Sequence, residues 1–69
     1  MQVSARNALK ATVKKVVDGA VNAEVILEIA PGVEVTAIIT KASADKLQLT
    51  EGKEAYAIIK SSDVMVAVN

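Results

Sequence analysis

Apolar and polar side chains alternate along most of this chain, and this alternation constrains its fold more than any other feature. The segment 9–14 has an apolar residue at every second position, and the runs 21–29 and 33–39 repeat the pattern. Successive side chains of a β-strand point to opposite faces, so a period of two gives each strand one dry and one wet face. The pattern therefore predicts an all-β protein. In the longest run the dry face carries Val21, Ala23, Val25, Leu27 and Ile29.

Short turn motifs separate these runs. Asp18-Gly19 predicts a hairpin between the first and second strands, and Pro31-Gly32 closes the second strand. Glu51-Gly52 predicts a third turn later in the chain. The adjacent Val16 and Val17 break the alternation of the first strand, which predicts a bulge or bend there.

One segment departs from the strand period. Residues 40–47 are helix-tolerant and begin with Thr40, a residue type that caps helix N-termini. We expect two helical turns here, with Ala44 and Leu47 facing inward. In the strand before this helix, Ile38 is apolar on the otherwise polar face, so that strand is expected to be covered on both sides.

The remaining runs, 55–60 and 64–68, predict a fourth and a fifth strand, joined by the polar residues 61–63. The predicted order is then three strands, a short helix and two strands. This is the plan of the OB-fold, a five-stranded Greek-key barrel with one short helix between strands 3 and 4. Since the chain has 69 residues and shows no linker or internal repeat, residues 1–69 are expected to form a single domain.

The size and composition of the chain predict an oligomer. A core built from 69 residues is only marginally stable, because too much surface stays exposed. Without Cys or His, the chain lacks disulfides and the usual zinc ligands as a means of stabilisation. Hydrophobic residues make up 52% of the chain, almost all of them aliphatic, and Tyr56 is the only aromatic residue. The aliphatic surplus is expected to be buried between subunits.

Several function classes are disfavoured. Without His and Cys the chain lacks the commonest general base and the thiol nucleophile, and its three glycines fall in predicted turns, so no catalytic residues and no enzyme activity are expected. Eight basic and eight acidic residues give a net charge of zero, which argues against nucleic-acid and membrane-surface partners. No apolar run reaches membrane-spanning length and the first residues lack a signal-peptide layout, so a cytoplasmic location is expected.

Three polar clusters do not fit a solvated strand face. They lie at the ends of predicted elements, with residues 4–7 before the first strand, 40–43 at the start of the helix and 60–62 after the fourth strand. Each is rich in hydrogen-bond donors, since Arg offers a planar fork, Lys a point charge, and Ser and Thr hydroxyl groups. Two cations with several neutral donors, beside the free N–H groups of a helix N-terminus, match a tetrahedral dianion.

A site made only of donors also discriminates between anions. Phosphate at neutral pH usually carries a proton, which would face other hydrogens in such a site, whereas sulfate, molybdate and tungstate carry none. Each cluster also has a simpler interpretation, in which Thr40 is only a helix cap, Arg6 pairs with a surface carboxylate, and the other polar residues belong to turns.

Three sequence motifs resemble those of the molbindin, or Mop, family. Residues 4–10, which read SARNALK, resemble the opening motif of the family, and residues 60–65, which read KSSDVM, resemble its closing motif. Ile39-Thr40 followed by Ser43 resembles the central motif. The spacing between the three motifs fits the family over essentially the whole chain.

The resemblance implies a fold, a ligand and an assembly. Family members are OB-fold domains that bind molybdate or tungstate, and the stand-alone members form hexamers, as trimers of dimers, with oxyanions held between subunits. By this likeness the chain is expected to bind the oxyanion for intracellular storage or homeostasis, with no cofactor and no other metal. The oxyanion ligands that the resemblance implies are Ser4, Ala5 through nearby backbone N–H groups, Arg6, Thr40, Ser43, Lys60 and Ser61.

Two other functions stay open at this stage. An OB-fold can bind single-stranded nucleic acid, but such proteins use stacking aromatic residues and a basic groove, and a lone Tyr56 with zero net charge offers neither. In the other alternative, the donor clusters only join the subunits of a structural oligomer, and the oxyanion is irrelevant.

Overall fold

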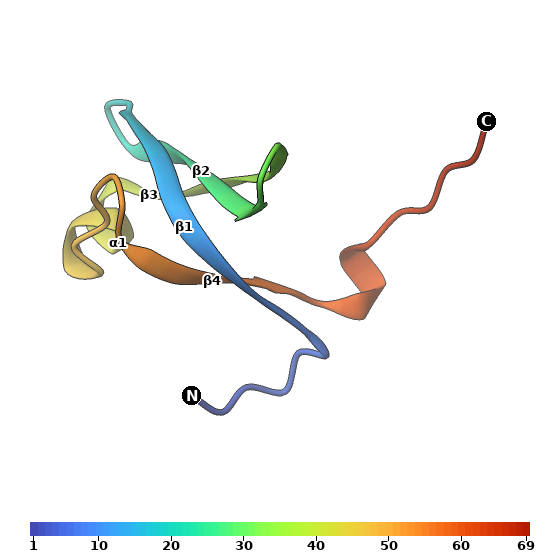
Figure 1. The fold of residues 1–69 in the computed structure, drawn as a ribbon. Helices are drawn as coiled ribbons and strands as arrows, with labels where there is room; N and C mark the ends of the chain where they lie inside the picture. The colour runs from blue at the N-terminus through green and yellow to red at the C-terminus, as the bar shows by residue number, and fades with distance from the viewer.

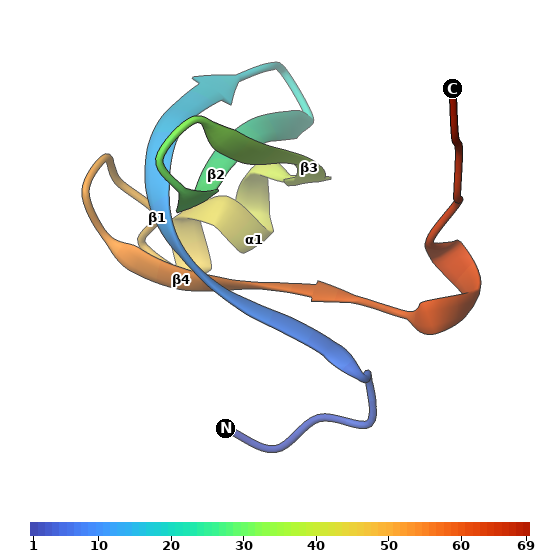
Figure 2. The same cartoon turned by 45° about the vertical axis from the view of Figure 1, so that its right-hand side comes forward.

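Four strands, one helix and one 3-10 turn make up the protein in the computed structural model, which describes all of residues 1–69 (Figure 1). They are β1 (Asn7–Asp18), β2 (Asn22–Ala30), β3 (Val33–Thr40), α1 (Lys41–Lys46), β4 (Glu54–Ile59) and η1 (Ser61–Asp63). The strands form one antiparallel sheet in the order β3-β2-β1-β4, so β3 and β4 are its two edges. The sheet curls strongly, and α1 lies at one end of the curl, between the end of β3 and the start of β4 (Figures 1 and 2).

The predicted all-β class is confirmed, and so is the position of the single short helix between the third and fourth strands. A curled antiparallel sheet with a helix at this point of the chain is the OB-like plan. No helix of the protein has the length needed to span a membrane, since the longest, α1, has six residues.

The predicted fifth strand is absent from the isolated chain, which is a correction to the five-stranded barrel. Residues 64–68 pair with no strand, and the chain beyond η1 runs away from the sheet in both views (Figures 1 and 2). A strand forms only where its backbone groups find a partner, and within this chain residues 64–68 do not reach the free edges of β3 or β4. Residues 64–68 alternate as a strand does, but no strand of this chain pairs with them.

The core lies on the concave face of the sheet and is built from small aliphatic side chains. The dry faces expected for the first two strands are confirmed at their centres, where Val13 and Val25 are only 1% exposed, but Val21, expected on the dry face of the second strand, lies before β2 and is 72% exposed. The expectation that the strand carrying Ile38 is covered on both sides is wrong for this chain. Ile38 is 62% exposed, and no other element covers its face of β3. The buried cluster consists of Ala11, Val13, Val25, Leu27 and Ala57.

The bulge in β1 lies two residues earlier than expected. The pairing with β2 shifts between Val13 and Lys15, so Lys14 is the extra residue. Inserting one residue reverses which side chains face inward, and Val16 therefore packs against the core while Val17 is exposed. The adjacent valines were a consequence of the bulge and did not mark its position.

All three expected turns are present, and Gly19 and Gly32 show two different reasons for glycine in them. Gly19 follows β1, and a Cβ at this position would meet the carbonyl oxygen of Asn22 at 2.9 Å. Gly32 has φ +77° in the two-residue connection between β2 and β3, a conformation that L-residues rarely adopt.

The start of α1 forms as predicted, and its end differs. The Thr40 hydroxyl accepts a hydrogen bond from the backbone N–H of Ser43 at 3.1 Å, which confirms Thr40 as the N-cap, and Ala44 is 4% exposed. Leu47, expected to face inward, is 57% exposed, because the helix ends at Lys46 and Leu49 packs against the core in its place.

Candidate functional site

Two of the three polar clusters meet where β1 begins and β4 ends. Asn7 and Ile59 are register partners in the β1–β4 ladder, and the Asn7 side-chain amide donates to the Ile59 carbonyl at 3.2 Å. Arg6 directly precedes this pair and Lys60 directly follows it, so the antiparallel register places the two cations opposite one another. We call residues 4–7 and 59–61 together the β1–β4 end.

The donors at the β1–β4 end have no competing partners. The side chains of Ser4, Arg6, Lys60 and Ser61 are exposed, and Ala5 is half-buried. Neither Arg6 nor Lys60 forms an ion pair. The simpler interpretation, in which Arg6 pairs with a surface carboxylate, is therefore wrong for this chain. The backbone N–H groups of residues 4–6 donate to no backbone carbonyl. The segment therefore presents two cations and several unused donors to solvent.

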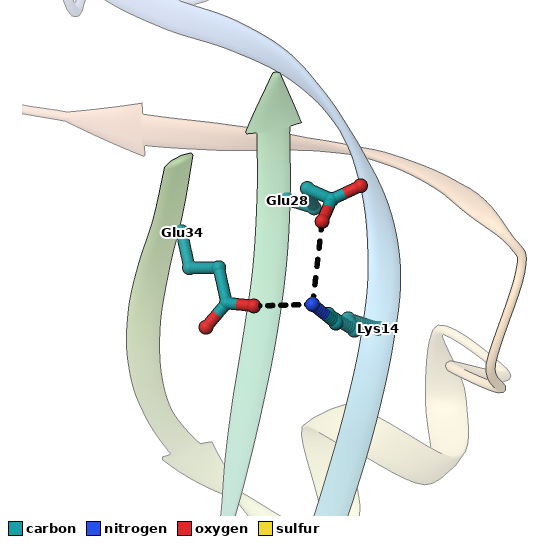
Figure 3. A network of polar contacts seen from close by, with 3 residues as sticks. All are labelled: Lys14, Glu28 and Glu34. Atoms are coloured by element: carbon teal, nitrogen blue, oxygen red, sulfur yellow. Dashed lines mark hydrogen bonds and ion pairs between the residues drawn. The ribbon is translucent and has the colours of Figure 1, made fainter. Parts of the chain in front are cut away.

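Two lysines of β1, Lys10 and Lys14, are already neutralised by carboxylates. Because it is the bulged residue, Lys14 reaches across β2 to Glu34 at 2.7 Å and to Glu28 at 3.4 Å (Figure 3). Hydrogen bonds to Glu34 and Glu28, with the attraction of their charges, raise the pKa of Lys14 above its ordinary value. Lys10 pairs with Glu54 at 3.2 Å. With carboxylates beside them, these two lysines are poor candidates for holding an anion.

The third cluster lies elsewhere in the fold. Thr40 ends β3 opposite Asn22, next to the pair formed by Ala23 and Asp18 at the far end of β1. The Thr40 hydroxyl donates to the Ser43 hydroxyl at 2.8 Å while it accepts the Ser43 N–H, so it serves as a cap. The hydroxyl hydrogen of Ser43 is then free to point outward.

Within one chain, the structure brings together the first and third predicted clusters but not the second. From Asn7 to Asp18 the path along β1 is about 36 Å at an ordinary strand rise. Both views place α1 and η1 well apart (Figures 1 and 2). No hydrogen bond joins Thr40 or Ser43 to the β1–β4 end. If all the predicted ligands bind one anion, a second copy of the chain has to contribute some of them.

Asn7 has a role that the sequence analysis did not assign. Its side chain holds the last carbonyl of β4 and thereby fixes the spacing between the strands that carry Arg6 and Lys60. The motif around Arg6 contained the residue, but its contact with Ile59, 52 positions away, depends on strand pairing. Asn7 therefore ties together the strand ends from which Arg6 and Lys60 continue.

The chemistry available at the β1–β4 end is donation to an anion. No group of three His, Cys, Asp or Glu side chains is placed to bind a metal cation. Guanidinium, ammonium, hydroxyl and amide N–H groups suit the oxygens of a tetrahedral oxyanion, and Arg can bind two of them at once.

Comparison with known proteins places these motifs in a family. Residues 3–66 match the TOBE domain. Molybdenum-pterin-binding protein 3 of Clostridium pasteurianum is 53% identical over 66 residues, which are 96% of this chain and 97% of that protein.

Two solved structures have the same fold. A molybdate-binding protein from Sporomusa ovata is 37% identical with a TM-score of 0.90, and the match covers 99% of this chain and all of that one. The cytoplasmic molybdate-binding protein ModG, in a form with molybdate bound, is 40% identical with a TM-score of 0.82, and the match covers 96% of this chain and 53% of that chain.

Proposed function

Because this chain belongs to the TOBE-domain family of molybdenum-pterin-binding (Mop) proteins, we propose that it binds molybdate or tungstate at contacts between copies of itself. The observation that carries this proposal is the pair of cations without an ion pair, Arg6 and Lys60, which stand at opposite positions just beyond the Asn7–Ile59 pair that ends the β1–β4 ladder. The proposal is a binding function, with no catalytic step.

A subunit contact supplies the ligands that one chain cannot assemble. Arg6, Lys60, the hydroxyls of Ser4 and Ser61, and the N–H near Ala5 come from one copy, and Thr40 and Ser43 come from another. Because the Thr40 hydroxyl is held by the helix cap, Ser43 is the donor of that cluster that reaches the anion most directly.

The donors are numerous enough for tight binding. A hydrogen bond to a charged group contributes about 1.5–3 kcal/mol, and micromolar affinity corresponds to roughly 8 kcal/mol. Four or five such bonds therefore reach micromolar affinity or better after the cost of ordering exposed side chains. A site of donors alone also excludes the protonated form of phosphate, because that proton finds no acceptor.

The assembly and the biological role belong to the same proposal. We propose a hexamer, built as a trimer of dimers, that stores or buffers the oxyanion in the cytoplasm. Extensive exposed aliphatic surface on the isolated chain supports self-association. The similarity to cytoplasmic ModG supports the location.

Calorimetry with single-site variants tests the proposed ligands. Arg6→Ala and Lys60→Ala should each weaken molybdate binding by at least about tenfold, because each removes a charge-assisted contact. Lys46→Ala is the matched control, since Lys46 is an unpaired lysine in the last turn of α1 and should leave affinity unchanged.

Thermal unfolding separates binding from a purely structural oligomer. A ligand that binds only the folded assembly raises the unfolding temperature, by an amount equivalent to about 2.7 kcal/mol at one hundred times its Kd. Molybdate should produce this increase and phosphate should not. An unfolding temperature unmoved by a large excess of molybdate or tungstate would leave only the structural role.

A further inference from the structure

Lys53 is a cation whose partners are backbone carbonyls. Its ammonium group donates to the carbonyl of Leu47 at 2.7 Å and to that of Gln48 at 3.2 Å, and it forms no ion pair. Both acceptors lie directly after α1, which ends at Lys46. The last carbonyls of a helix have no partner within it and carry partial negative charge, so a cation there is favourable. Lys53 therefore closes the C-terminal end of α1.

The turn that Lys53 holds has a costly backbone conformation. Gln48 is the only residue other than glycine with a positive φ, +54°. The N–H of Gln48 donates to the Asp45 carbonyl at 3.0 Å. The N–H of Leu49 donates to the Ala44 carbonyl at 3.1 Å, which completes the Schellman arrangement that ends many helices. Glycine ordinarily takes the left-handed position of this arrangement, because a Cβ is unfavourable there, and in this chain the Lys53 contacts hold a glutamine in its place.

The backbone of Lys53 is fixed to the core of the sheet. Its carbonyl accepts the Val13 N–H at 2.8 Å, and the N–H of Gly52 donates to the Val13 carbonyl at 2.8 Å. Val13 belongs to β1 and is 1% exposed. Lys53 therefore links the end of α1 to the buried centre of the sheet.

The helix has few other contacts that set its direction. It has six residues, too few for a helix to be stable without tertiary contacts, and Ala44 is its one buried residue. Because α1 follows β3 without a loop, the strand fixes its first residue. The direction that α1 takes from there depends on contacts further along, which are the burial of Ala44 and the hold of Lys53 on the C-terminal end.

A short chain of hydrogen bonds connects Lys53 to Ser43. The carbonyl of Ser43 accepts the Leu47 N–H at 2.9 Å, and the carbonyl of Leu47 accepts the Lys53 ammonium group. The side chain of Ser43 is exposed, and its only hydrogen bond is with Thr40 in the same turn. The direction of the Ser43 hydroxyl therefore follows the direction of the helix.

We propose that Lys53 is a positioning residue of the oxyanion site, which holds α1 so that Ser43 can donate to the anion. The inference rests on the proposed function, because it takes Ser43 as a ligand. Lys53 itself is not a ligand, since carbonyls use two of the three donors of its ammonium group. Without Lys53, α1 spends part of its time in orientations from which Ser43 misses the anion, and the affinity falls with the fraction of correctly oriented copies.

Calorimetry with three lysine variants tests the positioning role. Lys53→Met removes the donors and keeps an apolar stem, and it should weaken molybdate binding by about three- to tenfold. Lys53→Arg keeps donors for both carbonyls and should bind within about twofold of the wild type. Lys46→Met is the matched control, because it removes a cation from the same end of α1 that has no side-chain hydrogen bond or ion pair. It should leave the affinity unchanged.

Two double variants separate positioning from an effect of charge at a distance. Adding Lys53→Met to Ser43→Ala should cost no further affinity, because the hydroxyl that Lys53 positions is already absent. Adding Gln48→Gly to Lys53→Met should restore most of the lost affinity, since glycine adopts the left-handed turn without help from the lysine. An additive loss in the first case, or no recovery in the second, would show that Lys53 acts through its charge and would overturn the proposal.

Hydrogen exchange reports on α1 without any oxyanion. In Lys53→Met the amides of residues 47–49 should exchange at least about tenfold faster than in the wild type, while the amide of Val25 in the core keeps its rate. Unchanged exchange at residues 47–49 would show that Lys53 does not hold the helix. Equal molybdate affinity of Lys53→Met and the wild type would overturn the positioning role alone, whereas a wild type that binds no molybdate would refute the proposed function as well.

Discussion

At the scale of single residues, the basic side chains divide into those that form an ion pair with a carboxylate and those that form none. Lys10 and Lys14 belong to ion pairs on the sheet, whereas Arg6 and Lys60 have none. The sequence alone predicted the importance of Arg6 and Lys60 but could not show that they lie opposite each other. That placement follows from pairing between residues 52 positions apart.

The guanidinium geometry of Arg6 gives the first prediction. Arg6→Lys keeps the charge but replaces a planar fork, which can contact two oxygens, with a single ammonium group. Molybdate affinity should fall by about tenfold, less than for Arg6→Ala. Titration calorimetry on both variants checks the order, and equal affinity of Arg6→Lys and the wild type would exclude a two-point contact.

Lys14 gives a prediction about pH. Hydrogen bonds to Glu34 and Glu28 raise the pKa of Lys14 in the folded protein above its unfolded-state pKa. The protonated lysine therefore contributes its full share of stability below the unfolded-state pKa, and that share is lost as pH rises through the folded-state pKa. The wild type should therefore unfold at a higher temperature than Lys14→Gln at pH 7, and this advantage should shrink above pH 10.5.

Lys15→Gln is the matched control for this pH dependence, since Lys15 is the next residue and forms no ion pair. Its unfolding temperature should follow the wild type across the whole titration. A constant difference between the wild type and Lys14→Gln from pH 7 to pH 11 would contradict the assigned cause.

At the scale of elements, the residue that caps the helix was predictable from the sequence, whereas the end of the helix and the position of the bulge were not. Thr40 caps α1 as expected, because an N-cap requires only a hydroxyl three residues before an N–H group. Leu47 and the bulge at Lys14 were misplaced. The end of a six-residue helix and the position of an inserted residue both depend on which neighbour packs there, and periodicity does not contain that information.

The cap provides the prediction at this scale. Thr40→Ala should lower the free energy of unfolding by about 1 kcal/mol, because the Ser43 N–H loses its acceptor. Ser43→Ala keeps that N–H and its acceptor, so it should be destabilised by less. Chemical denaturation of both variants measures the difference, and a larger loss in Ser43→Ala would argue against the cap as the stabilising contact.

At the scale of the whole molecule, the chain leaves much of its apolar surface uncovered. The sequence predicts five strands, and the chain has four, with residues 64–68 exposed and an apolar groove open between β3 and β4. This difference could not be predicted, because alternating apolar residues predict a strand but not the strand that pairs with it.

The proposed division of the oxyanion site between copies gives a prediction that only an assembly can satisfy. Arg6→Glu and Ser43→Glu each place a carboxylate where the proposed dianion binds, so each variant alone should lose molybdate binding by charge repulsion. Suppose that every site takes the β1–β4 end from one copy and the Thr40–Ser43 cluster from its neighbour. A co-refolded equal mixture then pairs the variants at random, and half of the pairs are mixed.

In each mixed pair one site combines the intact Arg6 of one copy with the intact Ser43 of the other, while the second site carries both carboxylates. About a quarter of all sites should therefore recover wild-type affinity in the mixture. The binding stoichiometry from calorimetry measures this fraction, and the separately refolded variants mixed without subunit exchange provide the baseline. A mixture that binds no more molybdate than its two components would show that Arg6 and Ser43 do not meet across a subunit contact.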